Sequence, residues 1–229
     1  MILAIDTATA QVGVAIGDGG EMRGEVRVTG GRRHAERLAP AIQSLCSWTG
    51  IELKELSAVA VGIGPGLFTG LRVGVTTAKV MAQALRIPVV AVPSLDLVAY
   101  PLRHAGSLIA VVLDARRREV FHASYRPVPG GVQRVGDYGV GSPADVVAEL
   151  QEAGEHVLLA GDGVARYAPE LAALDHAEDA GPEFSSPSVT ALVQLATARF
   201  EREEFDTPWE VTPLYLRESD AELTWEMSR

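Results

Sequence analysis

The stretch ILAIDTATAQVGVAI, residues 2–16, contains two apolar runs that are separated by a short polar segment. Each run is predicted to form a strand, and Asp6-Thr7-Ala8-Thr9 between them is predicted to reverse the chain. Gly17-Asp18-Gly19-Gly20 is a second turn signal, and the alternation over residues 21–28 predicts a third strand. The chain is therefore expected to open as a three-stranded antiparallel meander.

The segments after the meander alternate between helix and strand signals. Apolar residues at spacings of three and four predict a helix, and they are Leu38, Ile42, Leu45 and Trp48. Pro40 is expected to kink this helix or to mark its start. A buried strand over residues 59–63, a helix over 71–85 and a strand over 88–92 should follow. Residues 1–102 are therefore predicted to form one α/β lobe.

The second half is predicted to repeat this plan loosely. Its strand signals cover residues 107–113, 119–125, 131–140 and 157–160. Helices are predicted over residues 142–151, with Ser142 as the N-cap and Pro143 at the first helical position, and over residues 189–200. The sequence thus predicts a duplicated α/β fold with a cleft between two lobes, of which the second and smaller covers residues 103–229.

Composition limits the classes of function. The 229 residues are 47% hydrophobic and 22% charged, and the single cysteine, Cys46, excludes an internal disulfide. No basic segment precedes the first apolar run, and no run reaches the roughly 18 residues that span a bilayer, so a cytoplasmic protein is expected. The net charge of −10 disfavours binding of tRNA or DNA by the chain alone, because such binding normally needs a basic face.

The stretch GIGPGLFTG, residues 62–70, places four glycines and a proline between a predicted strand and a predicted helix. On one interpretation, backbone N–H groups of Gly64, Gly66 and Thr69 bind a phosphate at the helix N-terminus. On the other, glycine and proline are needed only because the reversal from strand to helix is tight. The sequence leaves both interpretations open.

The order of the elements and the Asp6-Thr7 turn resemble the actin/hexokinase/Hsp70 (ASKHA) superfamily, whose two lobes clasp a nucleotide. Within that superfamily, five motifs resemble in register the TsaB family, also called YeaZ. They are IDT (5–7), RHAERLAP (33–40), GPGLFTGLR (64–72), LDAR (113–116) and PLYLR (213–217). The family supplies a bacterial subunit of the machinery that makes N6-threonylcarbamoyladenosine at position 37 of certain tRNAs. Leu67 departs from the family, which usually has Ser at this place.

The resemblance implies a nucleotide cleft in outline. Superfamily kinases and ATPases use an acid at the position of Asp6 to orient magnesium or water, although a turn acid that accepts from the backbone of Ala8 or Thr9 fits the sequence equally well. Gly161-Asp162-Gly163 stands where the adenosine turn of the second lobe would be. The cleft candidates are Asp6, Thr7, Gly64, Gly66, Thr69, Gly161 and Gly163.

The resemblance also bears on catalysis. The catalytic paralogue in this machinery, TsaD, binds metal through two histidines four residues apart, and Ser94 and Val98 stand at those places here. Neither side chain can replace an imidazole. The histidines of the chain are scattered singly, so no metal site and no catalytic residue are predicted. No cofactor follows from the residues, and ATP or ADP shared with a partner complex remains an alternative.

Two helices of the first lobe are predicted to carry surplus apolar surface. A stripe of small residues at spacing four, Gly70, Gly74, Ala78 and Ala82, would let another backbone come close. The alternative is that the stripe packs only on its own sheet, as part of it must. In the family, this helix pair packs against the matching pair of TsaD, or of a second copy when the chain is alone. The predicted interface residues are Leu38, Ile42, Leu45, Gly70, Val73, Gly74, Thr77, Val80, Met81 and Leu85.

Together these features predict a non-catalytic scaffold that activates TsaD, in a complex that a small ATPase, TsaE, joins. The alternative, from a different class, is a nucleotide-binding ATPase or small-molecule kinase that uses Asp6, the Gly64 loop and the Gly161 turn. A self-contained metalloprotease is a third alternative, which requires a metal site or an activated nucleophile.

Overall fold

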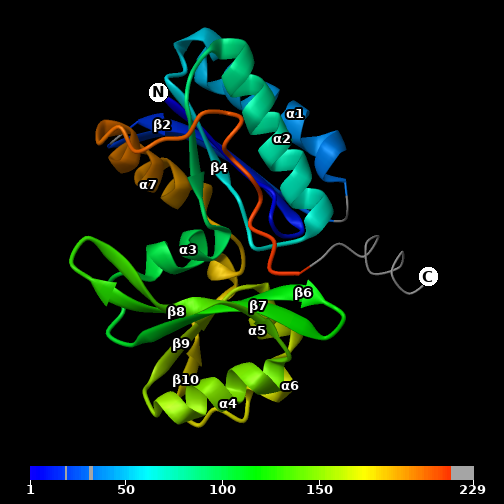
Figure 1. The fold of residues 1–229 in the computed structure, drawn as a ribbon, viewed down its shortest axis with the longest axis vertical. Helices are drawn as coiled ribbons and strands as arrows, with labels where there is room; N and C mark the ends of the chain where they lie inside the picture. The colour runs from blue at the N-terminus through cyan, green and yellow to red at the C-terminus, as the bar shows by residue number, and fades with distance from the viewer. Residues whose placement is uncertain (19, 31–32, 218–229) are drawn as a thin grey trace.

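The computed structural model describes residues 1–18, 20–30 and 33–217. The strands of the first sheet are β1 (Ile2–Asp6), β2 (Gln11–Asp18), β3 (Glu21–Thr29), β4 (Ala58–Gly62) and β5 (Val89–Val92). Their order is β3-β2-β1-β4-β5, antiparallel from β3 to β1 and parallel from β1 to β5. The helices α1 (His34–Thr49) and α2 (Phe68–Leu85) cover one face of this sheet (Figure 1). The predicted meander and the helices and strands after it are confirmed.

The second sheet has the same plan. Its strands are β6 (Leu108–Arg116), β7 (Glu119–Val128), β8 (Gly131–Gly141), β9 (Val157–Ala160) and β10 (Ala177–Asp179). Their order, β8-β7-β6-β9-β10, and the sense of every pairing repeat those of the first sheet. The helices between these strands are α4 (Pro143–Ala153), α5 (Asp162–Arg166) and α6 (Ala168–Leu171). The fold is therefore the predicted duplicated, two-lobed α/β fold of the ASKHA type.

Two predicted local features can be checked directly. Ser142 caps α4, since its hydroxyl oxygen accepts from the Asp145 N–H at 3.2 Å and Pro143 follows it. α1 begins at His34, so Pro40 lies inside that helix and not at its start. Short 3-10 turns over Leu53–Glu55, Tyr100–Leu102 and Pro182–Phe184 complete the regular structure of the described residues.

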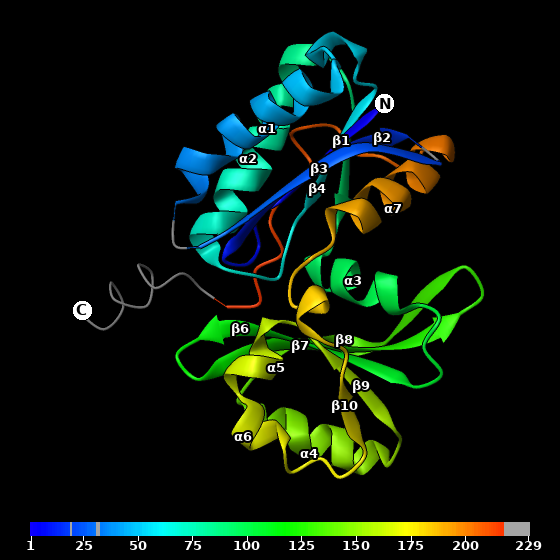
Figure 2. The same ribbon diagram turned by 180° about the vertical axis from the view of Figure 1, so that it is seen from behind.

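The last helix of each repeat packs on the sheet of the other repeat. α3 (Ser94–Ala99) follows β5, yet it lies against the second sheet, where Asp96 accepts from the Tyr125 and Tyr138 hydroxyls, both at 2.8 Å. α7 (Val189–Glu201) follows β10, yet it covers the free face of the first sheet (Figure 2). The expectation that residues 103–229 form the second lobe is therefore corrected for α7.

α7 fits the first sheet closely because most residues that β1, β2 and β4 present to it are small. In the strands, alternate side chains point to opposite faces. The face toward α1 and α2 carries Leu3, Ile5, Val14, Ile16, Val59 and Val61. The face toward α7 carries Ala4, Ala15, Ala58 and Ala60, together with the larger Ile2 of β1 and Val90 and Val92 of β5. Gly13 extends the small face, and a Cβ atom placed there would lie 2.8 Å from Cγ1 of Val189. The alternation of large and small residues thus decides which helix lies on which face.

After α7 the chain returns along the first lobe as an extended segment, residues 204–217, which we call the C-terminal strap. Its Asp206 pairs with Val89 at the edge of the first sheet, and the Val211 carbonyl accepts from Lys79 Nζ at 2.8 Å. Leu214 donates its N–H to the Ile63 carbonyl at 2.8 Å. Arg217 then reaches the second lobe, where Nη2 donates to the Ala115 carbonyl at 3.3 Å. The strap therefore joins the two lobes a third time, after the connections from β5 to β6 and from β10 to α7.

Gly13→Ala is expected to lower the free energy of unfolding by about 1–3 kcal/mol, because the added methyl group would push α7 away from the sheet. Gly20→Ala is the matched control, since a Cβ atom at Gly20 meets nothing within 4 Å. Urea unfolding of both variants measures the difference. Equal stability of the two variants would contradict the close packing of α7.

Candidate functional site

The predicted cleft candidate Asp6 ends β1 and is 3% exposed. Its Oδ1 accepts from the Ala8 N–H at 3.0 Å, and its Oδ2 accepts from the Ser94 hydroxyl at 2.7 Å. Gly62 at the end of β4 makes room for this carboxylate, because a Cβ atom there would lie 1.8 Å from Oδ2. Both carboxylate oxygens are thus engaged within the protein, as expected for a turn acid.

Ser94 connects Asp6 to the glycine loop. This residue, the first of α3, is fully buried. Its hydroxyl donates to Asp6 and accepts from the Gly64 N–H at 3.0 Å, and its own N–H donates to the Gly64 carbonyl at 2.7 Å. Val98, the other position compared with a metal ligand, is buried among apolar residues of the second lobe. Hydrogen bonds therefore join Asp6, Ser94 and Gly64 at the beginning of α3, and we call this group of three residues the pin.

Burial raises the pKa of Asp6 to about 6, although the hydrogen bonds from Ala8 and Ser94 act in the opposite direction. The carboxyl group is consequently ionised at neutral pH but takes up a proton under mildly acidic conditions. Its partners are neutral donors and no cation contacts it among the interactions of the described residues.

The glycine loop packs backbone against backbone on the β1–β2 turn. Leu67 donates its N–H to the Ala8 carbonyl at 2.7 Å, and a Cβ atom at Gly66 would lie 2.4 Å from that carbonyl oxygen. Gly64 has a φ of 98°, a left-handed conformation that favours glycine, and the Leu214 carbonyl of the strap lies 3.2 Å from its Cβ position. Since the Gly64 N–H is bound by Ser94, the prediction that it faces a phosphate is wrong.

The remaining cleft candidates lie in three places. Thr7 is buried, and its hydroxyl donates to the Gly70 carbonyl at 2.7 Å. Thr69 is exposed in the first turn of α2. Gly161 and Gly163 belong to the second lobe, where their Cβ positions would lie 2.1 and 2.8 Å from the Val112 carbonyl oxygen. Both glycines are therefore explained by close packing on β6, and the adenosine turn stays a prediction.

The second lobe contains a counterpart of the Asp6 turn that the sequence comparison of the two halves could have shown. Asp114 lies near the end of β6, the strand that corresponds to β1, and its Oδ1 accepts from the Arg116 N–H at 2.9 Å, two residues on, as Asp6 does with Ala8. Here the carboxylate contacts cations: Arg116 Nη1 lies 3.1 Å and Arg166 Nε 3.3 Å from it. The Tyr167 hydroxyl also donates to Asp114 at 3.1 Å. The turn is repeated, but its charge environment is not.

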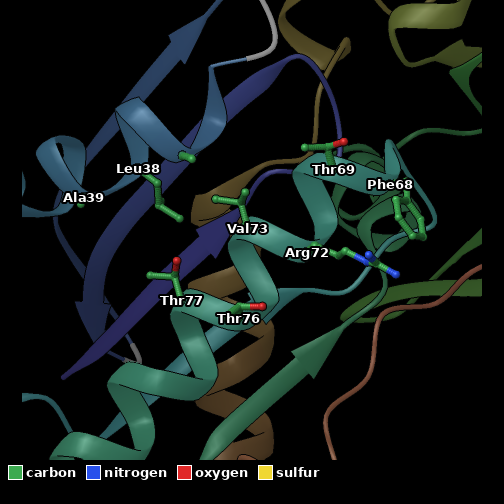
Figure 3. A pocket seen from close by; sticks show the side chains of 9 residues that line it. Leu38, Ala39, Phe68, Thr69, Arg72, Val73, Thr76 and Thr77 are labelled. Carbon is green, nitrogen blue, oxygen red and sulfur yellow. The ribbon is translucent and has the colours of Figure 1, made fainter. Parts of the chain in front are cut away.

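A groove of about 500 Å³ lies between α1 and α2. Figure 3 shows Leu38 of α1 facing Val73 and Thr77 of α2 across it. Its full lining is Ala35, Leu38, Ala39, Phe68, Thr69, Arg72, Val73, Thr76 and Thr77. The Arg72 guanidinium lies 3.8 Å from the centre of the Phe68 ring, and the Tyr215 ring of the strap lies 5.0 Å from the Phe68 ring. The groove is mostly apolar, with one cation at the end near the strap.

The structure divides the predicted interface residues into two sets. Leu38, Ile42 and Leu45 are 1%, 6% and 1% exposed and belong to the core of their own lobe, so the surplus surface inferred from Ile42 and Leu45 does not exist. The stripe of small residues also packs inward: Cβ atoms at Gly70 and Gly74 would lie 2.2 and 2.3 Å from atoms of Thr7. The prediction of an outward stripe is wrong because the β1–β2 turn needs that space.

The other predicted residues are accessible to different degrees. Val73 and Thr77 line the groove, and Val80 is 59% exposed one turn further along α2. Met81 and Leu85 are partly buried against the core of the first lobe. Trp48, which the helix pattern placed on the apolar face of α1, is 75% exposed. The accessible apolar surface of this helix pair therefore consists of the groove, Val80 and Trp48.

Comparison with known proteins identifies the family. Residues 26–225 match the family of TsaD, described as tRNA N6-adenosine threonylcarbamoyltransferase. The chain is 32% identical, over 98% of its length and 97% of the relative's, to the tRNA threonylcarbamoyladenosine biosynthesis protein TsaB of Bacillus subtilis (strain 168). This chain belongs to the TsaB family. The family resemblance predicted from the motifs is confirmed.

Further relatives agree with this assignment. The solved structure of YeaZ from Pseudomonas aeruginosa superposes with a TM-score of 0.79 at 29% identity, covering 94% of this chain and 99% of that one. An uncharacterised protein of Mycobacterium leprae (strain TN) is 39% identical over 96% of this chain, which spans 56% of that relative's length. The TsaB family takes part in tRNA threonylcarbamoyladenosine biosynthesis.

Within residues 1–18, 20–30 and 33–217, no three His, Cys, Asp or Glu side chains come together in a way that could hold a metal ion. In the same described part of the chain, no helix has the length and apolar character needed to cross a membrane.

Ser94→Ala is expected to lower the free energy of unfolding by about 2–3 kcal/mol, because it leaves one oxygen of the buried Asp6 carboxylate and the Gly64 N–H without a partner. Ser47→Ala, at an exposed position of α1, is the control and should change it by less than about 0.5 kcal/mol. Denaturant unfolding measures both. A Ser94→Ala variant as stable as the control would show that the pin contributes nothing.

The raised pKa of Asp6 predicts a pH dependence of stability. Its folded-state pKa of about 6 exceeds the ordinary value of 3.8, so protonation favours the folded state between these values. The free energy of unfolding should increase by about 1 kcal/mol on this account as the pH is lowered from about 7.5 to about 5.5. Asp6→Asn should remove this share of the dependence. Urea titrations at the two pH values test it, and an unchanged pH dependence in Asp6→Asn would contradict the assignment.

Proposed function

We propose that this chain is a non-catalytic cytoplasmic subunit of a complex that contains a TsaD homologue and forms N6-threonylcarbamoyladenosine at A37 of tRNAs. In this proposal the α1–α2 groove receives the TsaD homologue, and the reaction takes place on that partner. The single observation that carries the proposal is the contrast between the two candidate sites. The Asp6 carboxylate and the N–H groups of Gly64 and Leu67 are engaged internally, whereas the groove and Val80 are open.

The non-catalytic part of the proposal rests on the chemistry of the Asp6 turn. A carboxylate that orients magnesium or a nucleophile needs at least one oxygen directed toward the reacting group. Asp6 is 3% exposed and both its oxygens accept hydrogen bonds from Ala8 and Ser94. The Gly64 N–H is engaged by the same serine. These contacts favour a structural role for the turn over the kinase or ATPase alternative.

The choice of a TsaD homologue as the partner rests on the shape of the groove and on the match of this chain to the TsaD family. The groove has small side chains, Ala35 and Ala39, along α1 and threonines along α2, so another helix can approach closely. Since the chain matches the TsaD family over residues 26–225, a TsaD homologue offers a corresponding helix pair. Packing of two such pairs would form a four-helix interface. A second copy of the chain offers the same surface, so we also propose a homodimer when the partner is absent.

Further components of the complex follow from the family resemblance alone. A TsaE-type ATPase joins the assembly in this proposal, and any ATP or ADP is shared with the complex and not held by this chain alone. The isolated chain should bind tRNA only in the weak non-specific range of roughly 10⁻⁴ M at physiological salt, given its net charge of −10.

Val80→Asp is the sharpest test of the groove. A charge at a desolvated helix contact should weaken association with the TsaD homologue at least about a hundredfold, or about 3 kcal/mol, and abolish tRNA modification by the mixture. The isolated variant should unfold within about 0.5 kcal/mol of the parent, because Val80 is 59% exposed. Met81→Asp is less suitable, since Met81 packs on the core of its own lobe.

Val135→Asp is the matched control, because Val135 is 41% exposed on β8 of the second lobe. Size-exclusion chromatography of each variant with the TsaD homologue, followed by a tRNA modification assay, gives the readout. If Val80→Asp assembles as Val135→Asp does, the interface lies elsewhere. If it also assembles normally while Asp6→Ala abolishes an ATPase activity of the isolated chain, the kinase-like alternative is correct.

A further inference from the structure

Arginines gather around the β6–β7 hairpin of this acidic chain. They are Arg116, Arg117 and Arg118 in the hairpin, Arg166 at the end of α5 and Arg217 in the C-terminal strap. These five are a quarter of the 20 lysines and arginines in a chain of net charge −10. The tertiary structure thus concentrates cations that lie up to a hundred residues apart in the sequence.

Three of these arginines are held in place while their side chains stay open to solvent. Asp114 fixes Arg116 and Arg166 through contacts of 3.1 and 3.3 Å, and Arg217 pairs with Glu119. The side chains of Arg116, Arg166 and Arg217 remain 42%, 52% and 26% exposed. Among the described residues, the acids that contact this cluster are Asp114, Glu119 and Asp162, which lies next to Asp114, so they are fewer than the five arginines.

The hairpin tip is strained in a way that its sequence does not relieve. Arg116 pairs with Glu119, so Arg117 and Arg118 form a two-residue connection, with φ values of 53° and 61°. A connection with two positive φ angles normally takes Asn-Gly, because larger side chains are disfavoured there. Both arginines are exposed. Strain kept at an exposed, charged tip indicates a function for the charge.

We propose that this arginine cluster binds the phosphate backbone of RNA, and that it contributes to holding tRNA in the complex; the inference rests on the proposed function. Guanidinium groups match phosphate oxygens with paired N–H donors. Fixed cations on a protruding hairpin suit a backbone contact, which positions the RNA without reading its sequence. Figures 1 and 2 both show the β6–β7 hairpin on the same side of the molecule as the beginnings of α1 and α2. RNA bound there would lie beside a partner seated in the groove.

The double variant Arg117→Asn/Arg118→Gly separates binding from folding, because Asn-Gly relieves the strain of the turn. We expect its melting temperature to rise while the affinity of the complex for tRNA falls about tenfold at roughly 0.1 M salt. The slope of log affinity against log salt should decrease by about 2, equally for different tRNAs. Arg86→Gly, compared with Arg118→Gly, is the matched control, since Arg86 is also exposed and left-handed, with a φ of 57°, at the far end of α2.

Assembly with the TsaD homologue is measured separately by size-exclusion chromatography, so that failure of the proposed function is seen independently. The same variants are also titrated with tRNA as the isolated chain at low salt, where even weak backbone contacts are detectable. Loss of affinity in Arg118→Gly but not in Arg86→Gly supports the inference. An unchanged affinity and salt slope in the double variant, in the complex and in the isolated chain, would overturn it. A double variant that no longer binds the TsaD homologue would assign the hairpin to a protein contact instead and would also overturn it.

Discussion

The buried hydrogen-bonded pin formed by Asp6, Ser94 and Gly64 is the constraint on which the first lobe and its junction with the second depend. It joins the end of β1, the glycine loop after β4 and the beginning of α3, three points that are far apart in the sequence. A carboxylate in a position that is 3% exposed is tolerated only when its oxygens are satisfied. The Ala8 N–H and the Ser94 hydroxyl satisfy them, and in doing so they set the loop that starts α2. The orientation of the groove helix therefore follows from this pin.

The exchange of the last helix of each repeat makes the molecule one unit. α3 leaves the first repeat and packs on the second sheet, α7 returns from the second repeat to the first sheet, and the strap crosses between the lobes again. Here each lobe contributes a helix to the core of the other. Each lobe therefore depends on the other for part of its core, while the groove, Val80 and Trp48 lie on α1 and α2.

The two repeats contain the same acidic turn, at Asp6 and at Asp114, in different surroundings. Asp6 and Asp114 each accept the N–H group two residues on, at 3.0 and 2.9 Å. In the first lobe the other carboxylate oxygen of Asp6 accepts a hydrogen bond from the Ser94 hydroxyl, and Asp6 is buried. In the second lobe the carboxylate meets Arg116 and Arg166, and the turn stays at the surface with its cations around it. The duplicated fold thus provides a packing element in one lobe and a charged surface in the other, because the neighbours of the same acid differ.

The sequence by itself determined the order of the elements, the duplication and the family, because period-two and period-3.6 patterns and turn residues are local properties of the chain. It also placed the turn acid at Asp6 and the helix cap at Ser142. Only the tertiary structure decided which faces of α1 and α2 are covered by their own lobe. Ile42 and Leu45 belong to the core of that lobe, and Gly70 and Gly74 make room for Thr7. Val80 remains exposed. An apolar residue has the same pattern whether its own sheet or a partner covers it, so periodicity cannot separate the two. Contacts such as Ser94 with Asp6, or Arg217 beside the β6–β7 hairpin, depend on segments that only folding brings together.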